Sequence, residues 1–259
     1  MSLDFPQLTG VFSTNFAQST SPQRRLKQFG AFFLAALLLL AGCASGGSAM
    51  MQTTQLWVQQ VLLGSDDGLP QKPDPRFRYL RVEVPNLTPG LWVLAFVDPH
   101  AMGEIEVWYS AQNQVIKLQN GRVVATHGLA MDWPAVRFAA APPAWAALAA
   151  DKGVAAAFER QHDELPGYRY GVRQRLALQT LAQAPLLAGP GSLAPDLAKR
   201  YAWFSETATP HDGTVGGILT NWYAWGLHLG QRTVVFSEQC LKPDFCLRLQ
   251  RWPVQEDAS

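Results

Sequence analysis

Hydrophobic and polar positions divide the chain into a short apolar segment near the start and a long region of alternating segments. The first uninterrupted apolar run covers residues 29–40 and follows Arg24, Arg25 and Lys27. Its 12 residues are fewer than the ~20 that a transmembrane helix needs. A basic flank before a short apolar run is typical of a secretory signal. The pattern therefore favours export over a membrane-spanning anchor.

From residue 76 onward, most segments alternate between hydrophobic and polar side chains with the two-residue period of β-strands. The sequence predicts strands at residues 76–84, 91–97, 104–110, 114–118, 122–126, 167–180, 197–209, 221–228, 231–239 and 246–252. Residues 91–97 are apolar throughout, which predicts a strand buried on both faces. Asn120-Gly121 predicts a hairpin, because a type I′ turn needs positive φ at both central residues. A second hairpin is expected to turn near Leu229-Gly230.

Two segments favour helix instead of strand. Residues 53–63 keep helical spacing and predict a short N-terminal helix. Residues 133–158 form an Ala/Pro-rich insertion that we expect to be partly helical, over residues 145–158. Short strands with frequent turns and no βαβ rhythm predict a mainly β fold, an antiparallel sandwich or open barrel built from hairpins.

The residues after the apolar run carry a second signal. Leu40-Ala41-Gly42 stands directly before Cys43, which resembles the lipobox of bacterial lipoproteins. The resemblance implies cleavage between Gly42 and Cys43 and acylation of Cys43; a chance cysteine after a signal is the alternative. Several acyl chains at one residue hold a protein firmly on a membrane. We therefore expect a signal peptide over 1–42, a lipidated cysteine with a flexible tether over 43–50, and a periplasmic β-rich domain over 51–259.

Charge excludes some partners. The chain has 21 Lys+Arg and 20 Asp+Glu. Residues 1–42 hold three basic residues and one acidic residue, so the mature chain would carry 18 and 19, a net charge of −1. This balance argues against nucleic acid and against a polybasic membrane patch. The expected membrane contact is the lipid at Cys43.

The other two cysteines, Cys240 and Cys246, form an even pair in an exported chain, which predicts one disulfide. Two free buried thiols are the alternative. Two thiols without a nearby histidine make an incomplete ligand set, so we expect no metal site. No cofactor motif is present either.

No catalytic motif stands out. The sequence has no Gly-x-Ser-x-Gly elbow, no His-Glu-x-x-His and no phosphate-binding Gly-Lys loop. A carboxylate pair for glycan hydrolysis stays open, because its members can be far apart in sequence. Trp222 and Trp225 would suit either a sugar-stacking surface or, as we favour, core packing. Arg122 would be either a contact for an acidic polysaccharide or an exposed, solvated side chain, which we favour.

Two stretches resemble the YjbF/GfcB family of bacterial lipoproteins. The first is a Trp-x-Ser strand that leads to an Asn-Gly-Arg hairpin, and the second is a late Val-x-x-Ser-x-Gln-x-Leu-x-Pro strand. The positions that match are Trp108, Ser110, Asn120, Gly121, Arg122, Thr126, Gly128, Ser237 and Gln239. The Ala/Pro-rich segment and the Cys240/Cys246 pair depart from the family pattern.

The resemblance implies an outer-membrane lipoprotein with a mostly β periplasmic domain, no established catalytic residues and a part in capsule or exopolysaccharide production. Our hypothesis is a non-catalytic, lipid-anchored periplasmic protein that assists export or assembly of such a polymer. Its expected partners are the polysaccharide and other proteins of the export machinery. The alternatives are a glycan-processing enzyme of the cell envelope and a structural envelope lipoprotein.

Overall fold

A computed structural model describes residues 73–150, 155–187, 195–211 and 217–253. All of them belong to one compact unit, residues 54–259. The signal peptide, Cys43, the tether and the helix expected at residues 53–63 lie outside the described residues.

One antiparallel sheet contains all twelve described strands. They are β1 (Tyr79–Glu83), β2 (Gly90–Asp98), β3 (Ile105–Tyr109), β4 (Val115–Gln119), β5 (Arg122–His127), β6 (Val136–Phe138), β7 (Ala155–Glu164), β8 (Arg169–Leu181), β9 (Ala202–Pro210), β10 (Leu219–His228), β11 (Gln231–Lys242) and β12 (Phe245–Trp252). Two short helices, α3 (Trp145–Ala150) and α4 (Pro195–Ala198), lie between strands.

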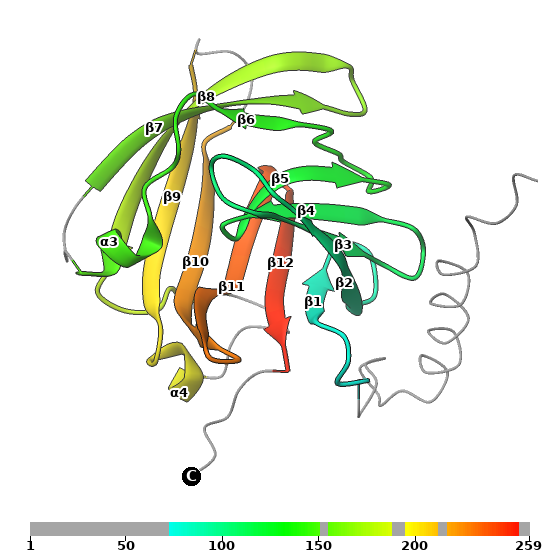
Figure 1. Ribbon diagram of the computed structural model, residues 1–259. Coiled ribbons are helices and arrows are strands. Elements are labelled where there is room, and N and C mark those ends of the chain that lie inside the picture. The colour runs from blue at the N-terminus through cyan, green and yellow to red at the C-terminus, as the bar shows by residue number, and fades with distance from the viewer. Residues whose placement is uncertain (1–72, 151–154, 188–194, 212–216, 254–259) are drawn as a thin grey trace, which may run out of the picture. The chain divides into compact units, whose positions relative to one another are not determined.

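The sheet order is β5-β4-β3-β2-β1-β12-β11-β10-β9-β8-β7-β6. Two meanders thus meet where β1 pairs with β12, and the outermost strands of the sheet are β5 and β6. These two ends approach each other: the Thr126 amide donates to the Trp133 carbonyl at 2.8 Å, and Asp132 bridges to Leu165. The sheet therefore curls into a nearly closed barrel (Figure 1). This confirms the mainly β prediction, in its open-barrel form.

Both hairpin turns form where the sequence predicts them. Asn120 and Gly121 have φ of 50° and 78°, and Leu229 and Gly230 have φ of 47° and 77°. Positive φ at both central residues is the requirement of a type I′ turn. Residues of both turns line the same pocket.

The helix expected over residues 145–158 is wrong in its second part. Helix α3 ends at Ala150, and residues 155–158 begin strand β7. Phe158 pairs with Leu176 in the ladder between β7 and β8. Alanine favours a helix locally, but the ladder hydrogen bonds and packing of the long hairpin override that preference.

Strand β2 is buried on both faces only in its first half, contrary to the expectation for residues 91–97. Leu91 and Trp92 are buried, whereas Phe96 is 44% exposed. The register with β3 shifts between Leu94 and Phe96. A β-bulge of this kind bends the strand and redirects its side chains.

Buried hydrophobic side chains form a large cluster and a smaller, separate one. Fully buried side chains include Trp108, Tyr223 and Leu176. On another part of the sheet, Trp203 and Phe236 pack with Ala198 of α4, and Trp203 Nε1 donates to the Ala198 carbonyl at 2.8 Å.

A disulfide joins the last two strands, β11 and β12. Cys240 and Cys246 form a disulfide between directly opposed positions of β11 and β12. Among the described helices, none combines the length and the apolar character needed to cross a membrane.

Candidate functional site

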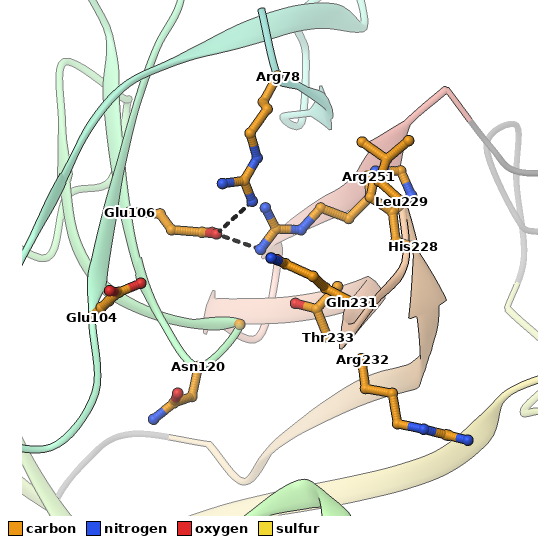
Figure 2. Close-up of a pocket in the computed structure, with 11 residues that line it drawn as sticks. Arg78, Glu104, Glu106, Asn120, His228, Leu229, Gln231, Arg232, Thr233 and Arg251 are labelled. Atoms are coloured by element: carbon orange, nitrogen blue, oxygen red, sulfur yellow. Dashed lines mark hydrogen bonds and ion pairs between the residues drawn. The ribbon is translucent and has the colours of Figure 1, made fainter.

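A pocket of about 370 Å³ opens where the β4–β5 turn comes together with the β10–β11 turn (Figure 2). Its volume lies toward the lower end of the ~300–1,000 Å³ range of small-molecule sites. The residues that line it are Arg78, Glu104, Glu106, Asn120, Gly121, His228, Leu229, Gln231, Arg232, Thr233 and Arg251. They come from opposite ends of the sequence, and the meeting of β1 with β12 is what brings the first and last of them together.

Two arginines share one glutamate on the inner wall of this pocket. Arg78 Nη2 is 3.3 Å from Glu106 Oε1, and Arg251 Nη2 is 2.6 Å from Glu106 Oε2. The indole Nε1 of Trp108 also donates to Glu106 Oε2, at 3.3 Å. Two guanidinium groups against one carboxylate leave the inner wall with net positive charge.

Arg251 is the more deeply placed of the two arginines, with only 4% of its side chain exposed. Its Cζ lies 5.1 Å from the centroid of the Trp108 ring, and its Nε donates to the Val234 carbonyl at 3.4 Å. Its Nη1 has no hydrogen-bond partner among the described residues. A buried N–H left unpaired costs about 1–3 kcal/mol, so this atom is a place where an added acceptor would be favourable.

His228 forms another part of the wall. Burial, with the nearby Arg251 and Arg78, lowers the pKa of His228 to about 4. The imidazole is therefore neutral at pH 7 and offers one N–H donor and one acceptor nitrogen rather than a further positive charge.

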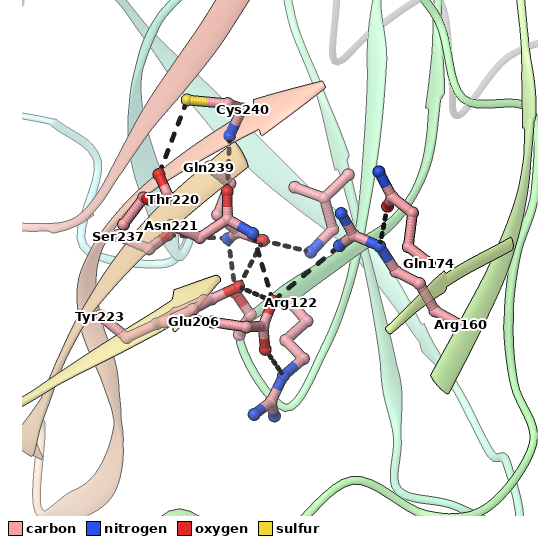
Figure 3. Close-up of polar contacts among 12 residues, drawn as sticks. Arg122, Arg160, Gln174, Glu206, Thr220, Asn221, Tyr223, Ser237, Gln239 and Cys240 are labelled. Carbon is pink, nitrogen blue, oxygen red and sulfur yellow. Dashed lines mark hydrogen bonds and ion pairs between the residues drawn. The ribbon is translucent and has the colours of Figure 1, made fainter. Parts of the chain in front are cut away.

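A second charged cluster lies inside the barrel (Figure 3). One of its members, Arg122, directly follows the Asn120-Gly121 turn that lines the pocket. Its centre is Glu206 of β9, which is fully buried. Arg122 Nε is 2.9 Å from Glu206 Oε2, and Arg160 Nη1 is 3.9 Å from Oε1. Asn221 Nδ2 and the Tyr223 hydroxyl donate to Oε1 at 3.2 and 3.1 Å. Strands β5, β7, β9 and β10 are thereby joined through one carboxylate.

Two neighbouring arginines keep the Glu206 carboxylate ionised. Burial by itself would raise the pKa of Glu206, but Arg122 and Arg160 outweigh it and hold the pKa below its usual value. Burial, followed by the charge of Glu206, raises the pKa of Tyr223 well above its usual value. The tyrosine therefore stays protonated and serves as a donor.

Arg122 does not lie on the surface, so the interpretation of an exposed, solvated side chain is wrong. Its side chain is 3% exposed, and its Cζ lies 4.0 Å from the centroid of the Trp145 ring. Trp145, on α3, donates its Nε1–H to the Asn120 carbonyl at 2.7 Å. Pairing with a buried carboxylate and stacking on an indole together account for the burial of a guanidinium here.

Gln239 clamps the β4–β5 turn to β11. Its Oε1 accepts from the Val123 amide at 2.8 Å, and its Nε2 donates to the Gly121 carbonyl at 2.8 Å and to Ser237 Oγ at 2.9 Å. The two stretches of the family pattern, far apart in sequence, are thus joined by direct hydrogen bonds.

Two other positions of the family pattern support the strand before this turn. Trp108 is fully buried in the core beneath Arg251. Ser110 Oγ accepts from the backbone amides of Gln112 and Gln114 at 3.1 and 3.0 Å, which closes the turn between β3 and β4.

The remaining two positions shape the segment that follows β5. Thr126 Oγ1 accepts from the Trp133 amide at 2.9 Å. Gly128 has φ of 82°, and its amide donates to Asp132 Oδ2 at 2.8 Å. Both contacts help to fold the chain back along the edge of β5.

Neither of the two tryptophans proposed as sugar contacts lines the pocket. Trp225 is half-buried and packs against the cluster that contains Tyr223 and Trp145, and Arg232 stacks on it with Cζ 5.2 Å from the ring centroid. Trp222 is half-buried on the same strand. The described residues contain no group of His, Cys, Asp and Glu that could hold a metal ion.

A second buried histidine, His162, lies on β7. The His162 ring lies 4.1 Å from the Trp133 ring, and its Nε2 is 2.8 Å from Glu164 Oε1. Burial, then the charges of Arg160 and Arg169, lowers the pKa of His162 to about 3. Both His162 and His228 are therefore neutral in the folded protein near pH 6, whereas a histidine in the unfolded chain titrates near pH 6.5.

We expect the protein to lose stability as the pH falls from 6.5 to 5. The unfolded chain then binds protons that folded His162 and His228 do not, and each site contributes up to about 1.4 kcal/mol per pH unit. Urea unfolding at several pH values measures the slope. His162→Gln should reduce the slope of unfolding free energy against pH by the contribution of one histidine. His127→Gln, at an exposed position, should leave the slope unchanged. An unchanged slope in His162→Gln would contradict the buried, neutral state.

Comparisons with known proteins agree with this architecture. Residues 74–186 match the family model described as group 4 capsule polysaccharide lipoprotein gfcB, YjbF. The chain is also similar to the crystal structure of the hypothetical lipoprotein YmcC from Escherichia coli (K12), with a TM-score of 0.56 and 16% sequence identity. That similarity covers 80% of this chain and 96% of the other, and at this identity it shows a shared fold. No curated protein matches the chain.

The matched range begins before β1 and extends beyond β8, so it contains the Asn120-Gly121 turn, Glu106 and Arg122. Ser237 and Gln239 lie beyond it but contact the turn directly. The match of residues 74–186 to the YjbF family model confirms the resemblance seen in the sequence.

Proposed function

We propose that this protein is a non-catalytic, lipid-anchored periplasmic protein that assists the export or assembly of a capsule or exopolysaccharide. The observation that carries the proposal is the family match over residues 74–186, whose description names capsule polysaccharide. The proposal includes acylation at Cys43, which lies outside the described residues, and a position on the periplasmic face of the outer membrane. Polysaccharide and export-machinery proteins are its proposed partners.

The pocket supports a binding role rather than a chemical one. Glycoside hydrolysis uses two carboxyl groups on either side of the bond, one of which must give and take a proton. Glu106 already accepts hydrogen bonds from Arg78, Arg251 and Trp108. Glu104 also lines the pocket but is exposed. A carboxylate held by two arginines and an indole is suited to fixing those groups in place.

The experiment that tests the proposal compares a strain lacking the gene with the same strain carrying the wild-type gene. Polymer on the cell surface and total polymer in the cell are measured separately. We expect the deletion to reduce surface polymer by tenfold or more, while polymer continues to be made inside the cell. Unchanged surface polymer would overturn the proposal, and loss of all polymer would point to synthesis instead of export.

Incubation of the purified full-length protein with isolated polymer is the matched test for catalysis. The proposal expects no new reducing ends and no change in chain length. An increase in reducing ends that Glu106→Gln abolishes would favour the glycan-processing enzyme.

A further inference from the structure

On the inner wall of the pocket, two guanidinium groups face a single carboxylate. Arg78 and Arg251 both contact Glu106, which has one negative charge to offer. The guanidinium of Arg232, which also lines the pocket, points away from Glu106 (Figure 2). Its Cζ lies 5.2 Å from the centroid of the Trp225 ring. Glu104 also lines the pocket, but it is exposed and forms no ion pair with Arg78 or Arg251 among the described residues.

The guanidinium of Arg251 is fixed before any ligand arrives. Glu106 holds Nη2, the Val234 carbonyl accepts from Nε, and Trp108 lies against its plane. Nη1 is the nitrogen without a partner among the described residues. Arg78 reaches the same carboxylate from the other side and is 47% exposed, so it lies nearer the opening. Held guanidinium groups bind anions well, because little conformational entropy is lost on contact.

Apart from Glu104, Leu229 and Arg232, the rest of the wall is neutral and polar. Gln231 and Thr233 contribute an amide and a hydroxyl, His228 contributes a neutral imidazole, and Asn120 contributes a second amide. Groups of this kind exchange hydrogen bonds with hydroxyl groups and do not favour an apolar ligand. The combination of two guanidinium groups on the inner wall and several neutral polar side chains around them matches a ring with several hydroxyls and one acidic group.

We propose that this pocket binds an anionic saccharide, with its carboxylate against Arg251 and Arg78 and its hydroxyls against the neutral polar side chains. The proposal rests on the proposed function in one respect: it names the acidic sugar units of the polymer as the bound species. Binding involves no bond-making step. Loss of the Arg78 guanidinium should weaken binding, because a charge-assisted hydrogen bond to the carboxylate disappears.

Calorimetric titration of the full-length protein in an uncharged detergent tests this directly. The probes are sodium glucuronate, glucose and inorganic phosphate. Glucuronate has both the ring and the carboxylate, glucose has the ring alone, and phosphate has charge without the ring. We expect saturable binding of glucuronate, with glucose and phosphate each at least about tenfold weaker.

Arg78→Gln is the test variant, because Arg78 is half exposed and its loss should not prevent folding. We expect it to weaken glucuronate binding by about tenfold. Arg76→Gln is the matched control: Arg76 is 74% exposed, pairs with Asp74 and does not line the pocket. It should bind glucuronate like the wild type. Thermal melting of both variants verifies that they fold.

Three results would overturn the inference: no glucuronate binding, equal binding of glucuronate and glucose, or no effect of Arg78→Gln. Phosphate binding as tight as that of glucuronate would also overturn it, by showing an anion site without selection for a sugar. Surface polymer that depends on the gene, together with no glucuronate binding, would reject this inference and leave the proposed function standing.

Discussion

Glu206→Gln will lower the free energy of unfolding by about 3 kcal/mol or more, as measured by urea denaturation at pH 7. Removing one partner of a buried ion pair typically costs about 3–5 kcal/mol, because the remaining charge stays buried without compensation. Here two charges remain, those of Arg122 and Arg160. The amide of glutamine can keep some of the hydrogen bonds that Glu206 accepts, which places the expected loss toward the low end of this range.

Two further variants make the result specific to charge. Glu159→Gln on β7 removes an exposed carboxylate and should change the free energy of unfolding by less than about 0.5 kcal/mol. Adding Arg160→Met to Glu206→Gln removes one uncompensated cation, so the double variant should recover part of the loss, a coupling that a double-mutant cycle measures. A loss below about 1 kcal/mol in Glu206→Gln alone would show that the carboxylate does not hold the cluster together.

Gly121→Ala is expected to destabilise the protein by about 2–5 kcal/mol, through two separate effects. Gly121 has φ of 78°, where an added Cβ costs about 1–2 kcal/mol. That Cβ would also lie 2.5 Å from Cβ and Cγ2 of Val234 on β11. Forcing extra atoms into a packed region costs a further ~1–3 kcal/mol. The hairpin would have to move away from β11, although Gln239 clamps it there.

Gly230→Ala separates the two effects. Gly230 has nearly the same φ, 77°, but no atom lies within 4 Å of the Cβ that would be added. This variant should lose only the unfolding free energy that an alanine costs at positive φ, about 1–2 kcal/mol. The difference in unfolding free energy between the two alanine variants therefore measures the contact with Val234. Equal losses would mean that β11 and the hairpin are not packed as closely as the structure shows.

Local features of the fold could be predicted from the sequence because they depend on neighbouring residues. Asn120-Gly121 requires positive φ wherever it forms a hairpin, and Leu229-Gly230 behaves in the same way. The alternation in residues 167–180 correctly predicts strand β8, with Leu176 and Leu178 buried and Arg173 exposed.

Features set by distant pairing could not be predicted. Residues 155–158 look helical until β8 is available as a partner. Arg122 looks solvated until Glu206, on a distant strand, provides its counter-charge inside the barrel. The sequence did contain one sign of this cluster. Glu206 alternates with Phe204 and Ala208 along β9, so a carboxylate stands on the strand face that is otherwise apolar.

The pocket itself had almost no local signature. Arg78 and Arg251 are separated by most of the chain and meet at Glu106 only because β1 pairs with β12. The sequence did indicate Asn120 and Gly121, through the family resemblance. The motif therefore pointed to the right region, while its charged partners needed the three-dimensional structure.

Complementation of the deletion strain tests whether the protein works in polysaccharide export from a lipid-anchored position. Surface polymer is compared between strains that carry the wild type and Cys43→Ser, at equal protein levels and with the membrane fraction assayed for the protein. We expect Cys43→Ser to leave the membrane fraction and to fail to restore surface polymer. Full restoration by a Cys43→Ser protein that is absent from the membrane would contradict it.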